Sequence, residues 1–441
     1  MSKKRAIRKL QHYVRELWSL TPRDLVQVFW DKYDERFQVR SRFTKKKANA
    51  AKPVVLIPSA YVNASRTGLN FVANMPNPES LLVTTRANGE IRGHFRNVQS
   101  ASLAGYCFGQ DNQAEQRKIL NRWERLKTDL ANDSRISVVS ALGLLESFPR
   151  FLRRGLAIRD AWINVIESEP IRAVLSCDNN PDTLLPVLLA KNKGIPTVSI
   201  HHGALDWRHR FLPVHADAIV AKGKMEEDHL ARICEISKDK IKVGVPAKML
   251  PNAVPRKVSG NADSIVFFSE AYEPNRVRGE EMYKDVMPHL ANLAAQHQRK
   301  LIIKLHPFES LRKRKALLNK ILSPEQMRVT HVVSGALTAD LLERTWFGVT
   351  ILSTVAMECQ AANVPCFVCS WLEYPHHEYG DQFRRFGVGY PLQSSNEIKN
   401  IPQMLEHIPP ASIADLWQTT SSSELQQLFL RSEKSETVVP R

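Results

Sequence analysis

A lysine, a histidine and a proline end the apolar run KLIIKLHP at residues 300–307. Because side chains alternate along a strand, Lys304 and His306 should lie on one face, with Leu305 on the other. Pro307 biases the backbone of His306 towards an extended conformation and stops a helix from forming there. The sequence therefore predicts an ammonium and an imidazole together at the end of a buried strand, where they can bind an anion such as a phosphate.

A second polar group occurs further along the chain, in ILSTVAMEC at residues 351–359. The pattern predicts that a strand ends at Leu352 and that a helix starts at Ser353 and Thr354. Two hydroxyls, free backbone N–H groups and the helix dipole would make this helix start an anion site. Glu358 lies one turn after Thr354 on the same face, where it can accept hydrogen bonds from ribose hydroxyls. The predicted nucleotide-binding residues are Lys304, His306, Ser353, Thr354 and Glu358.

Each of these residues also has a structural alternative. A serine before a helix often only caps it, a histidine at a strand end can form internal hydrogen bonds, and a glutamate can lie on the surface. The nucleotide interpretation depends on finding all of them together, at equivalent strand ends in the same half of the chain.

Short apolar segments alternate with helical segments from Lys52 onward. Strands are expected at residues 53–58, 81–85, 171–177, 264–270, 300–306 and 347–352, and within 363–370. Such alternation is typical of parallel sheets wrapped by helices, in which ligands bind beyond the carboxyl ends of the strands. The predicted fold class is α/β, with two Rossmann-like doubly wound domains facing a cleft (GT-B) and a basic helical N-terminal extension.

The predicted boundaries follow changes in composition. Residues 1–50 form a basic amphipathic helical segment, 51–255 an N-terminal Rossmann-like domain, 256–400 a C-terminal Rossmann-like domain, and 401–441 a helical segment with a tail. The two Rossmann-like domains share one local plan. In each, Gly194 or Asn363 is expected to end a helix in a left-handed conformation, shortly before a proline and a strand.

The composition is that of a soluble globular protein: 441 residues, 43% hydrophobic and 24% charged. No apolar stretch reaches the ~18 residues of a spanning helix, and the N-terminus has no signal-peptide core, so a cytoplasmic location is expected. Cys366 and Cys369 form a C-x-x-C pair, but their segment is expected to be a buried strand, without a second pair or a histidine cluster nearby.

The formal net charge of +17 is concentrated at the N-terminus, where residues 1–50 hold 14 Lys and Arg against 5 Asp and Glu. Apolar residues recur there at helical spacing beside the basic ones. This pattern favours docking on an anionic membrane surface. The alternative is a solvated helix face that packs on the protein's own core. Nucleic acid is not an expected partner, because no recognition motif accompanies the charge.

The motifs KLHP and ST, followed by Glu358 and VP at 364–365, carry a resemblance to a known family. They resemble the donor half of inverting GT-B glycosyltransferases of bacterial capsule and surface polysaccharide synthesis. The nearest groups are capsule polysialyltransferases, capsule Kdo transferases and CDP-glycerol glycerophosphotransferases. The resemblance covers residues 170–400. It implies that His306, Ser353 and Thr354 hold the donor phosphate, that Glu358 meets the ribose, and that residues 51–255 bind the acceptor.

The base of such a transfer has two candidates, because the chain has no clear copy of the acidic pair plus glycine found in polysialyltransferases. SIHHGAL places His202 and Gly203 at a strand end and resembles the HG of the teichoic acid and capsule enzymes. SCDNNPDTL places Asp178 and Asp182 at the end of the preceding strand. A histidine or an aspartate could take the proton of the acceptor hydroxyl. His202 is the first candidate and Asp178 the second. Asp182 can instead cap the next helix, and in HHGA the alternative is a turn that needs only Gly203.

The resemblance implies an inverting glycosyltransferase that moves a sugar from a nucleotide donor to a growing surface glycan or glycolipid. One histidine and one helix start suit a single phosphate, which favours a CMP-sugar. No D-x-D motif occurs, so neither a metal nor a further cofactor is expected. The alternatives are a CDP-alditol phosphotransferase, a UDP-sugar transferase or 2-epimerase, and a non-catalytic membrane-associated nucleotide-binding scaffold. The expected partners are a nucleotide sugar, a glycan or lipid-linked acceptor, and the inner face of the cytoplasmic membrane.

Overall fold

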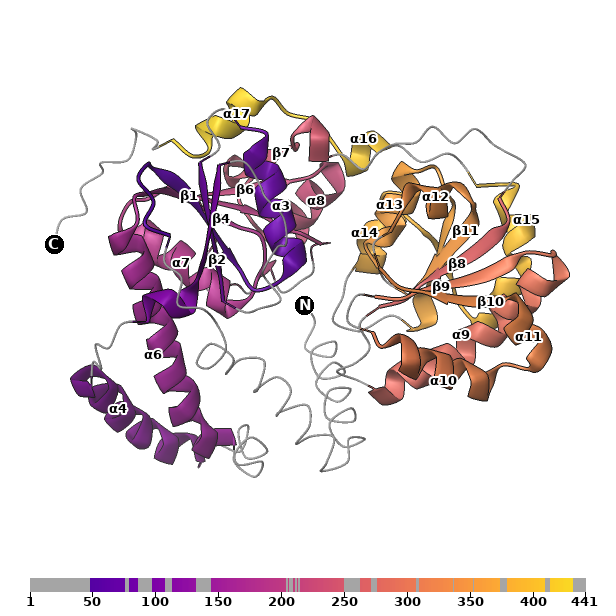
Figure 1. Cartoon of the computed structure of the whole chain (residues 1–441), viewed down its shortest axis with the longest axis horizontal. Helices are drawn as coiled ribbons and strands as arrows, with labels where there is room; N and C mark the ends of the chain where they lie inside the picture. The colour runs from indigo at the N-terminus through magenta and orange to yellow at the C-terminus, as the bar shows by residue number, and fades with distance from the viewer. Residues whose placement is uncertain are drawn as a thin grey trace. The chain divides into compact units, whose positions relative to one another are not determined.

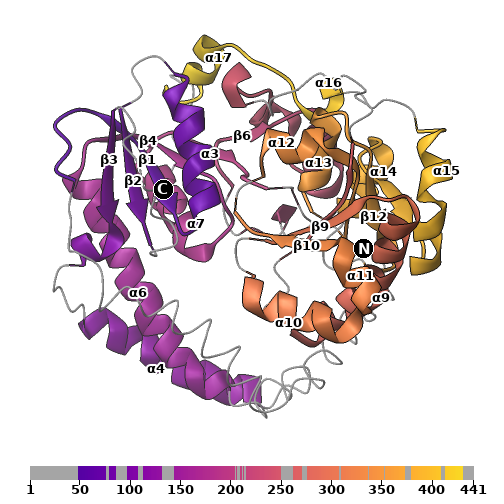
Figure 2. The same ribbon diagram turned by 45° about the vertical axis from the view of Figure 1, so that its right-hand side comes forward.

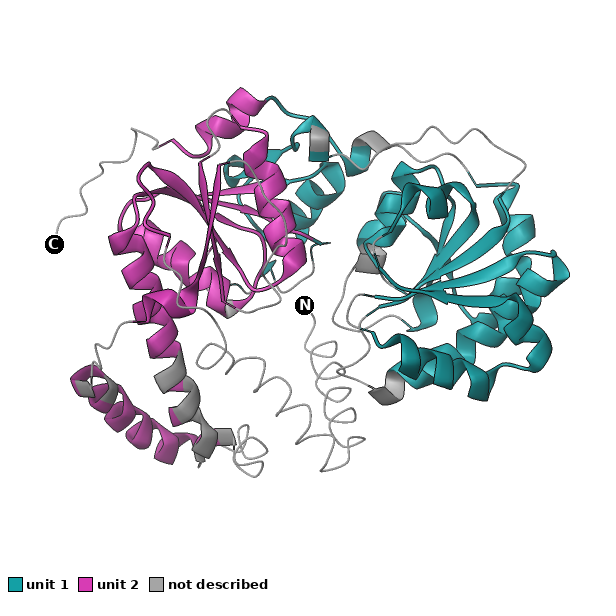
Figure 3. Ribbon diagram, viewed as in Figure 1, with its two compact units in different colours: residues 1–31, 203–212, 220–421 teal, residues 32–202, 213–219, 422–441 magenta. Residues whose placement is uncertain are grey.

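The computed structural model describes residues 48–430, apart from 76–78, 86–96, 108–112, 132–143, 204, 206–208, 211, 213–214, 250–261, 271–275, 307–308, 336, 352, 373–378 and 409–412. Two parallel sheets form its framework (Figure 1). The chain divides into two compact units (Figure 3). Unit 1 includes Gly203–Leu212 and Val220–Ser421, and unit 2 includes the described residues up to His202, Pro213–Ile219 and those after Ser421. The predicted segment 1–50 lies outside the described residues except for Ala48–Ala50.

The first sheet has seven strands in the order β3-β2-β1-β4-β5-β6-β7. Their bounds are β1 (Val54–Ser59), β2 (Ser80–Thr84), β3 (Val98–Ser102), β4 (Ile171–Ser176), β5 (Thr197–Ile200), β6 (Ala218–Ala221) and β7 (Ile241–Val243). The order reverses between β1 and β4, which are paired in parallel. In an open α/β sheet such a switch point is where ligands bind. The helices among the described residues before β8 are α3 (Val62–Ala73), α4 (Gln113–Ala131), α6 (Leu144–Ser168), α7 (Pro181–Asn192) and α8 (Lys224–Asp228).

The second sheet has six strands in the order β10-β9-β8-β11-β12-β13. Their bounds are β8 (Ser264–Phe268), β9 (Lys300–Lys304), β10 (Thr330–Val333), β11 (Thr345–Thr350), β12 (Cys366–Cys369) and β13 (Tyr390–Leu392). The helices that follow β8 within unit 1 are α9 (Arg276–Gln296), α10 (Leu311–Ile321), α11 (Pro324–Val329), α12 (Ala339–Glu343), α13 (Val355–Ala361), α14 (Tyr379–Arg385), α15 (Ile401–Leu405) and α16 (Ile413–Leu416). The last helix, α17 (Ser422–Gln427), belongs to unit 2. Helices α9, α10 and α11 cover one face of this sheet, and α12 and α13 cover the other (Figures 1 and 2). The predicted α/β, doubly wound class is therefore confirmed in both sheets.

The shared helix ending predicted for the two halves is confirmed. Gly194 (φ 65°) and Asn363 (φ 53°) both adopt the left-handed conformation, each directly after the C-cap residue of its helix, α7 or α13. In both places the next amide reaches back over the last turn, from Ile195 to the carbonyl of Ala190 at 2.9 Å and from Val364 to that of Cys359 at 2.7 Å. The same hydrogen bond thus ends both helices and directs the chain into the next strand.

One buried carboxylate holds the described segment Ala48–Ala50, which precedes strand β1. Glu169 accepts hydrogen bonds from the amides of Asn49 (3.1 Å) and Ala50 (2.7 Å) and from the Tyr106 hydroxyl (2.6 Å). The Tyr106 oxygen also accepts the amide of Ala48 at 3.1 Å. Burial, together with the hydrogen bond to Glu169, raises the pKa of Tyr106, which therefore remains a donor at all ordinary pH values.

Cys366 and Cys369 lie buried in strand β12, as predicted. Burial raises the pKa of the Cys369 thiol well above its ordinary value, which disfavours the thiolate needed for redox or metal chemistry. No group of three metal-binding side chains occurs in the part of the chain that the structure describes. Among the same residues, no helix is both long and apolar enough to cross a membrane.

Gly348 in β11 provides a test of the packing of the second sheet. A Cβ atom at this position would lie 2.8 Å from Cε2 of Phe268 and 3.4 Å from the sulfurs of Cys359 and Cys366. We expect Gly348→Ala to lower the free energy of unfolding by about 1–3 kcal/mol, because the core would be overpacked. Gly155→Ala is the control, since its Cβ would meet nothing within 4 Å and it lies in helix α6. It should stabilise by about 0.4–1 kcal/mol. Urea unfolding measures both, and equal effects would contradict the close packing around Gly348.

Candidate functional site

His202 and Asp178 follow two neighbouring strands of the first sheet. Strand β4 ends at Ser176 and strand β5 at Ile200, and the two are paired in parallel, so the residues after them share one sheet edge. The backbone of His202 donates to the Cys177 carbonyl at 3.1 Å, and its ring Nδ1 lies 2.9 Å from the same oxygen. A carbonyl only accepts hydrogen bonds, so Nδ1 carries the proton. In the neutral ring Nε2 therefore has the lone pair that a base requires.

Asp178 is only 4% exposed. Its Oδ1 accepts hydrogen bonds from the Asn180 amide at 2.8 Å and from the Thr183 hydroxyl. Its Oδ2 is buried and has no hydrogen-bond partner of normal geometry among the described residues, although the Ala60 amide is near enough to favour the ionised form. Burial raises the pKa of Asp178. The hydrogen bonds and the nearby His202 partly oppose this rise.

These environments separate the roles of the two base candidates. The Asp178 carboxylate cannot reach a substrate hydroxyl because both its oxygens are buried or occupied, whereas His202 is partly exposed. Of the two base candidates, His202 is thus the one with an accessible side chain, and Asp178 lies close enough for the charges of the two groups to interact. The alternative that Asp182 caps helix α7 is wrong. The N-cap of α7 is Asn180, whose side chain accepts the Asp182 amide at 3.0 Å.

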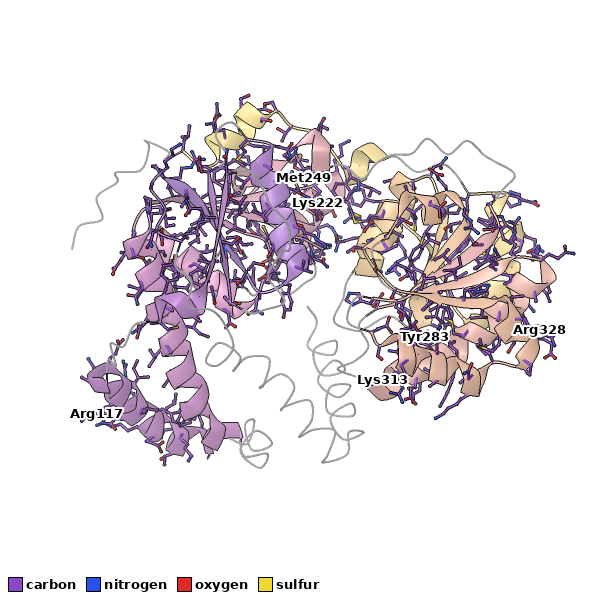
Figure 4. All side chains as sticks on the ribbon, viewed as in Figure 1. Arg117, Lys222, Met249, Tyr283, Lys313 and Arg328 are labelled. Carbon is purple, nitrogen blue, oxygen red and sulfur yellow. The ribbon has the colours of Figure 1, made fainter. Side chains whose placement is uncertain are left out.

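Gly203, the residue after His202, is held by a buried ion pair that the sequence did not reveal. Lys222, at the end of β6, donates to the Gly203 carbonyl at 2.8 Å and to Glu226 at 2.7 Å (Figure 4). Both side chains are at most 6% exposed. Lys222 and Glu226 lie in the charged segment AKGKMEE at residues 221–227. Nothing in that segment distinguishes these two side chains, which point inward, from its other charged side chains.

Lys304 lies at the end of β9 and is 8% exposed. Its ammonium donates to the carbonyls of Gly335 at 2.6 Å and Leu305 at 3.1 Å. Burial lowers the pKa of Lys304, and the charges of Glu309 and Glu358 oppose that effect. The side chain thus has a structural role, which the sequence-based prediction of an anion ligand did not include. It also places a positive charge beneath this edge of the sheet.

His306 is partly buried, and its backbone amide donates to Oε2 of Glu309 at 2.9 Å. Burial lowers the pKa of the His306 imidazole, and the charge of Lys304 lowers it further. Pro307 lies outside the described residues. The imidazole is therefore mainly neutral at neutral pH in the absence of ligand, and the structure places it within the electrostatic reach of Lys304.

Glu309 and Arg314 form a second buried ion pair that sequence reasoning missed. Arg314 Nε donates to Glu309 Oε1 at 2.7 Å, and the Glu309 side chain is fully buried. The Arg314 guanidinium lies 4.7 Å from the ring centre of Tyr283, whose hydroxyl is 2.8 Å from the Ser269 hydroxyl. Tyr283 is labelled in Figure 4. Glu309 therefore connects the backbone of His306 to the core of unit 1. The sequence offered one sign of this contact, because Glu309 follows His306 by three residues and its side chain can reach back to the His306 amide.

Ser353 and Thr354 precede helix α13, which begins at Val355 rather than at Ser353. The Ser353 hydroxyl accepts the Val355 amide at 3.3 Å, whereas Thr354 makes no side-chain cap. Burial raises the pKa of Glu358 in the first turn of this helix, and Lys304 partly lowers it. The structure thus brings Glu358 and His306 into the field of one lysine. Strands β9 and β11 are separated only by β8, about 10 Å from axis to axis.

The Glu309–Arg314 pair can be tested by its effect on stability. Glu309→Gln leaves a buried guanidinium without its counter-charge, so we expect a loss of about 3–5 kcal/mol in the free energy of unfolding. Combining it with Arg314→Met should cost less than the two single changes added together, because both remove the same interaction.

The control is the exposed pair of Asp263 and Arg344, which are 2.6 Å apart in the same unit. Asp263→Asn should cost at most about 1 kcal/mol near neutral pH. Urea denaturation of all the variants completes the measurement. Additive losses for Glu309 and Arg314 would contradict their acting as one unit.

Known proteins resemble this chain in fold but not in sequence. No family profile and no curated protein matches the sequence. Among solved structures, a protein assigned as UDP-N-acetylglucosamine 2-epimerase from Listeria monocytogenes is 13% identical, with a TM-score of 0.54 over 89% of this chain and 99% of that one. The UDP-GlcNAc 2-epimerase of Methanocaldococcus jannaschii is 12% identical, with a TM-score of 0.52 over 86% and 99%. At such identities the likeness concerns the fold. This chain therefore has a GT-B-like architecture of two parallel α/β sheets, similar to that of these proteins.

Proposed function

We propose that this chain is an enzyme that acts on a nucleotide sugar. The observation that carries the proposal is the placing of His306 and Glu358 in the field of the buried Lys304, at the carboxyl ends of β9 and β11. In a doubly wound sheet this edge is where ligands bind. The fold comparisons support the same class of substrate, because the compared proteins are described as enzymes of UDP-GlcNAc.

In this proposal, different residues bind the phosphate and the ribose of the nucleotide. His306 donates a hydrogen bond to phosphate, and the hydroxyls and amides of Ser353 and Thr354 complete the phosphate contacts. Glu358 accepts hydrogen bonds from the ribose hydroxyls. The Lys304 ammonium already donates to two carbonyls, so it attracts the phosphate through its charge and not through a direct hydrogen bond.

Two reactions fit this site, and each has its own support. The comparisons support 2-epimerisation of a UDP-sugar, which needs no acceptor. The motifs of the two halves support transfer to a glycan or lipid-linked acceptor, with His202 as the base and a CMP-, CDP- or UDP-linked donor. We rank UDP first among the nucleotides to be tested, since the fold comparisons point to it and none points to CMP.

The proposal predicts that a nucleotide raises the melting temperature of the protein, because a ligand of the folded state stabilises it by mass action. UDP, CDP and CMP are compared at equal concentrations, with adenosine monophosphate as the control. Turnover is then followed with UDP-GlcNAc alone and with an oligosaccharide acceptor added. A new epimer without acceptor indicates the epimerase, whereas acceptor-dependent release of nucleotide indicates the transferase. No shift with any nucleotide would overturn the proposal, and binding without turnover would indicate a scaffold.

His306→Ala should weaken nucleotide affinity roughly 10- to 150-fold, the equivalent of about 1.5–3 kcal/mol for a charge-assisted hydrogen bond. Ser353→Ala should act in the same direction, and the double change should be less than additive if both residues bind one phosphate. His331→Ala is the control, because this histidine is exposed on strand β10 of the same sheet. Calorimetry measures all four variants.

The affinity of the wild type should also increase as the pH falls from about 8 to about 6. A phosphate attracts a protonated imidazole, and the pKa of His306 lies below its ordinary value of about 6.5 in the free protein. Binding should therefore take up protons, which calorimetry detects as a dependence on the buffer. A His306→Gln variant with an unchanged pH profile would show that another group titrates.

A further inference from the structure

Helix α10 presents a face of a single charge sign. Its buried residues are Arg314, Leu317 and Leu318. Its exposed residues are Leu311, Arg312, Lys313, Lys315, Ala316, Asn319 and Lys320. No acidic residue occurs from Ser310 to Leu322. At 100° per residue, the four exposed cations fall within one arc of about 160°, opposite the buried residues.

The fifth cation of the helix shows why the face is arranged in this way. Arg314 turns inward, where its charge is compensated by Glu309. The outward cations have no carboxylate within their own helix, so their mutual repulsion is not offset there. Helix α4 is a contrast. It carries five cations, Arg117, Lys118, Arg122, Arg125 and Lys127, but Glu115, Glu124 and Asp129 are interspersed among them.

We propose that the exposed face of α10, defined by Arg312, Lys313, Lys315 and Lys320, docks unit 1 on the surface of an anionic lipid bilayer. Each basic side chain near such a surface contributes to binding, and the contributions fall with salt. Leu311 is 37% exposed at the start of the helix and adds an apolar contact. The formal charge of +17 steers the whole chain towards a negative surface.

Lipid fits this face better than nucleic acid does. The exposed residues of α10 include no aromatic side chain on which a base could stack. They do include the apolar Leu311, which a bilayer can accommodate. The helix lies in the outer layer of the second sheet with α9 and α11 (Figures 1 and 2), and Figure 4 marks Lys313 on it. The proposal is independent of which nucleotide the protein binds.

The test compares two full-length variants with equal changes of net charge. One carries Arg312→Gln, Lys313→Gln, Lys315→Gln and Lys320→Gln, and the other carries Lys118→Gln, Arg122→Gln, Arg125→Gln and Lys127→Gln. Binding is measured by co-sedimentation with vesicles of phosphatidylcholine, with and without phosphatidylserine. We expect the α10 variant to lose at least about 10-fold in binding to the anionic vesicles and the α4 variant less than about 3-fold. The N-terminal segment is identical in both, so the difference reports on α10.

A third variant keeps the charge by exchanging the four α10 cations, Arg for Lys and Lys for Arg, and it should bind like the wild type. Unchanged melting temperatures show that the substitutions act at the surface. Equal losses in the α10 and α4 variants would overturn the proposal, because net charge alone would then explain binding. It would also be overturned by undiminished binding of the α10 variant, or by α10-dependent binding to an RNA oligonucleotide without binding to vesicles.

Discussion

A charge that is removed from water needs a partner inside the protein, and this requirement determines the edge of the second sheet. Lys304 is nearly buried and uses two backbone carbonyls as partners. Glu309 is fully buried and is paired with Arg314, while its second oxygen holds the amide of His306. The backbone of His306 is thus fixed by a network whose members cannot move independently. A residue meant to contact a phosphate gains from such a support, because its orientation is set before the ligand arrives.

The two halves of the chain meet the same requirement differently. In unit 2, Asp178 is buried and accepts hydrogen bonds from Asn180 and Thr183, while the ring of His202 is oriented by the Cys177 carbonyl. In unit 1, the buried carboxylate of Glu309 accepts a hydrogen bond from the backbone amide of His306. The charge of Lys304 lowers the pKa of the His306 imidazole. The two histidines therefore differ in which atom is held: ring Nδ1 lies against a carbonyl in His202, whereas the backbone amide is bound by a carboxylate in His306.

Much of the fold could be predicted from the sequence, because apolar strands, helix patterns and left-handed helix endings are local signals. The segments before Gly194 and Asn363 show this directly, since each ends in the expected left-handed residue. The positions of His202, His306 and Glu358 at strand and helix ends were also predictable. The partners that hold them were not. Glu309, Arg314 and Lys222 belong to charged segments, and only tertiary packing decides which charged side chain turns inward.

The clamp around Glu169 has a mechanical consequence. The amides of Ala48, Asn49 and Ala50 converge on this carboxylate and on Tyr106, at the end of the long helix α6. Tension applied before Ala48 would therefore be shared between these hydrogen bonds and the main chain that leads into strand β1. Part of the load would pass through Glu169 to helix α6, which ends one residue earlier.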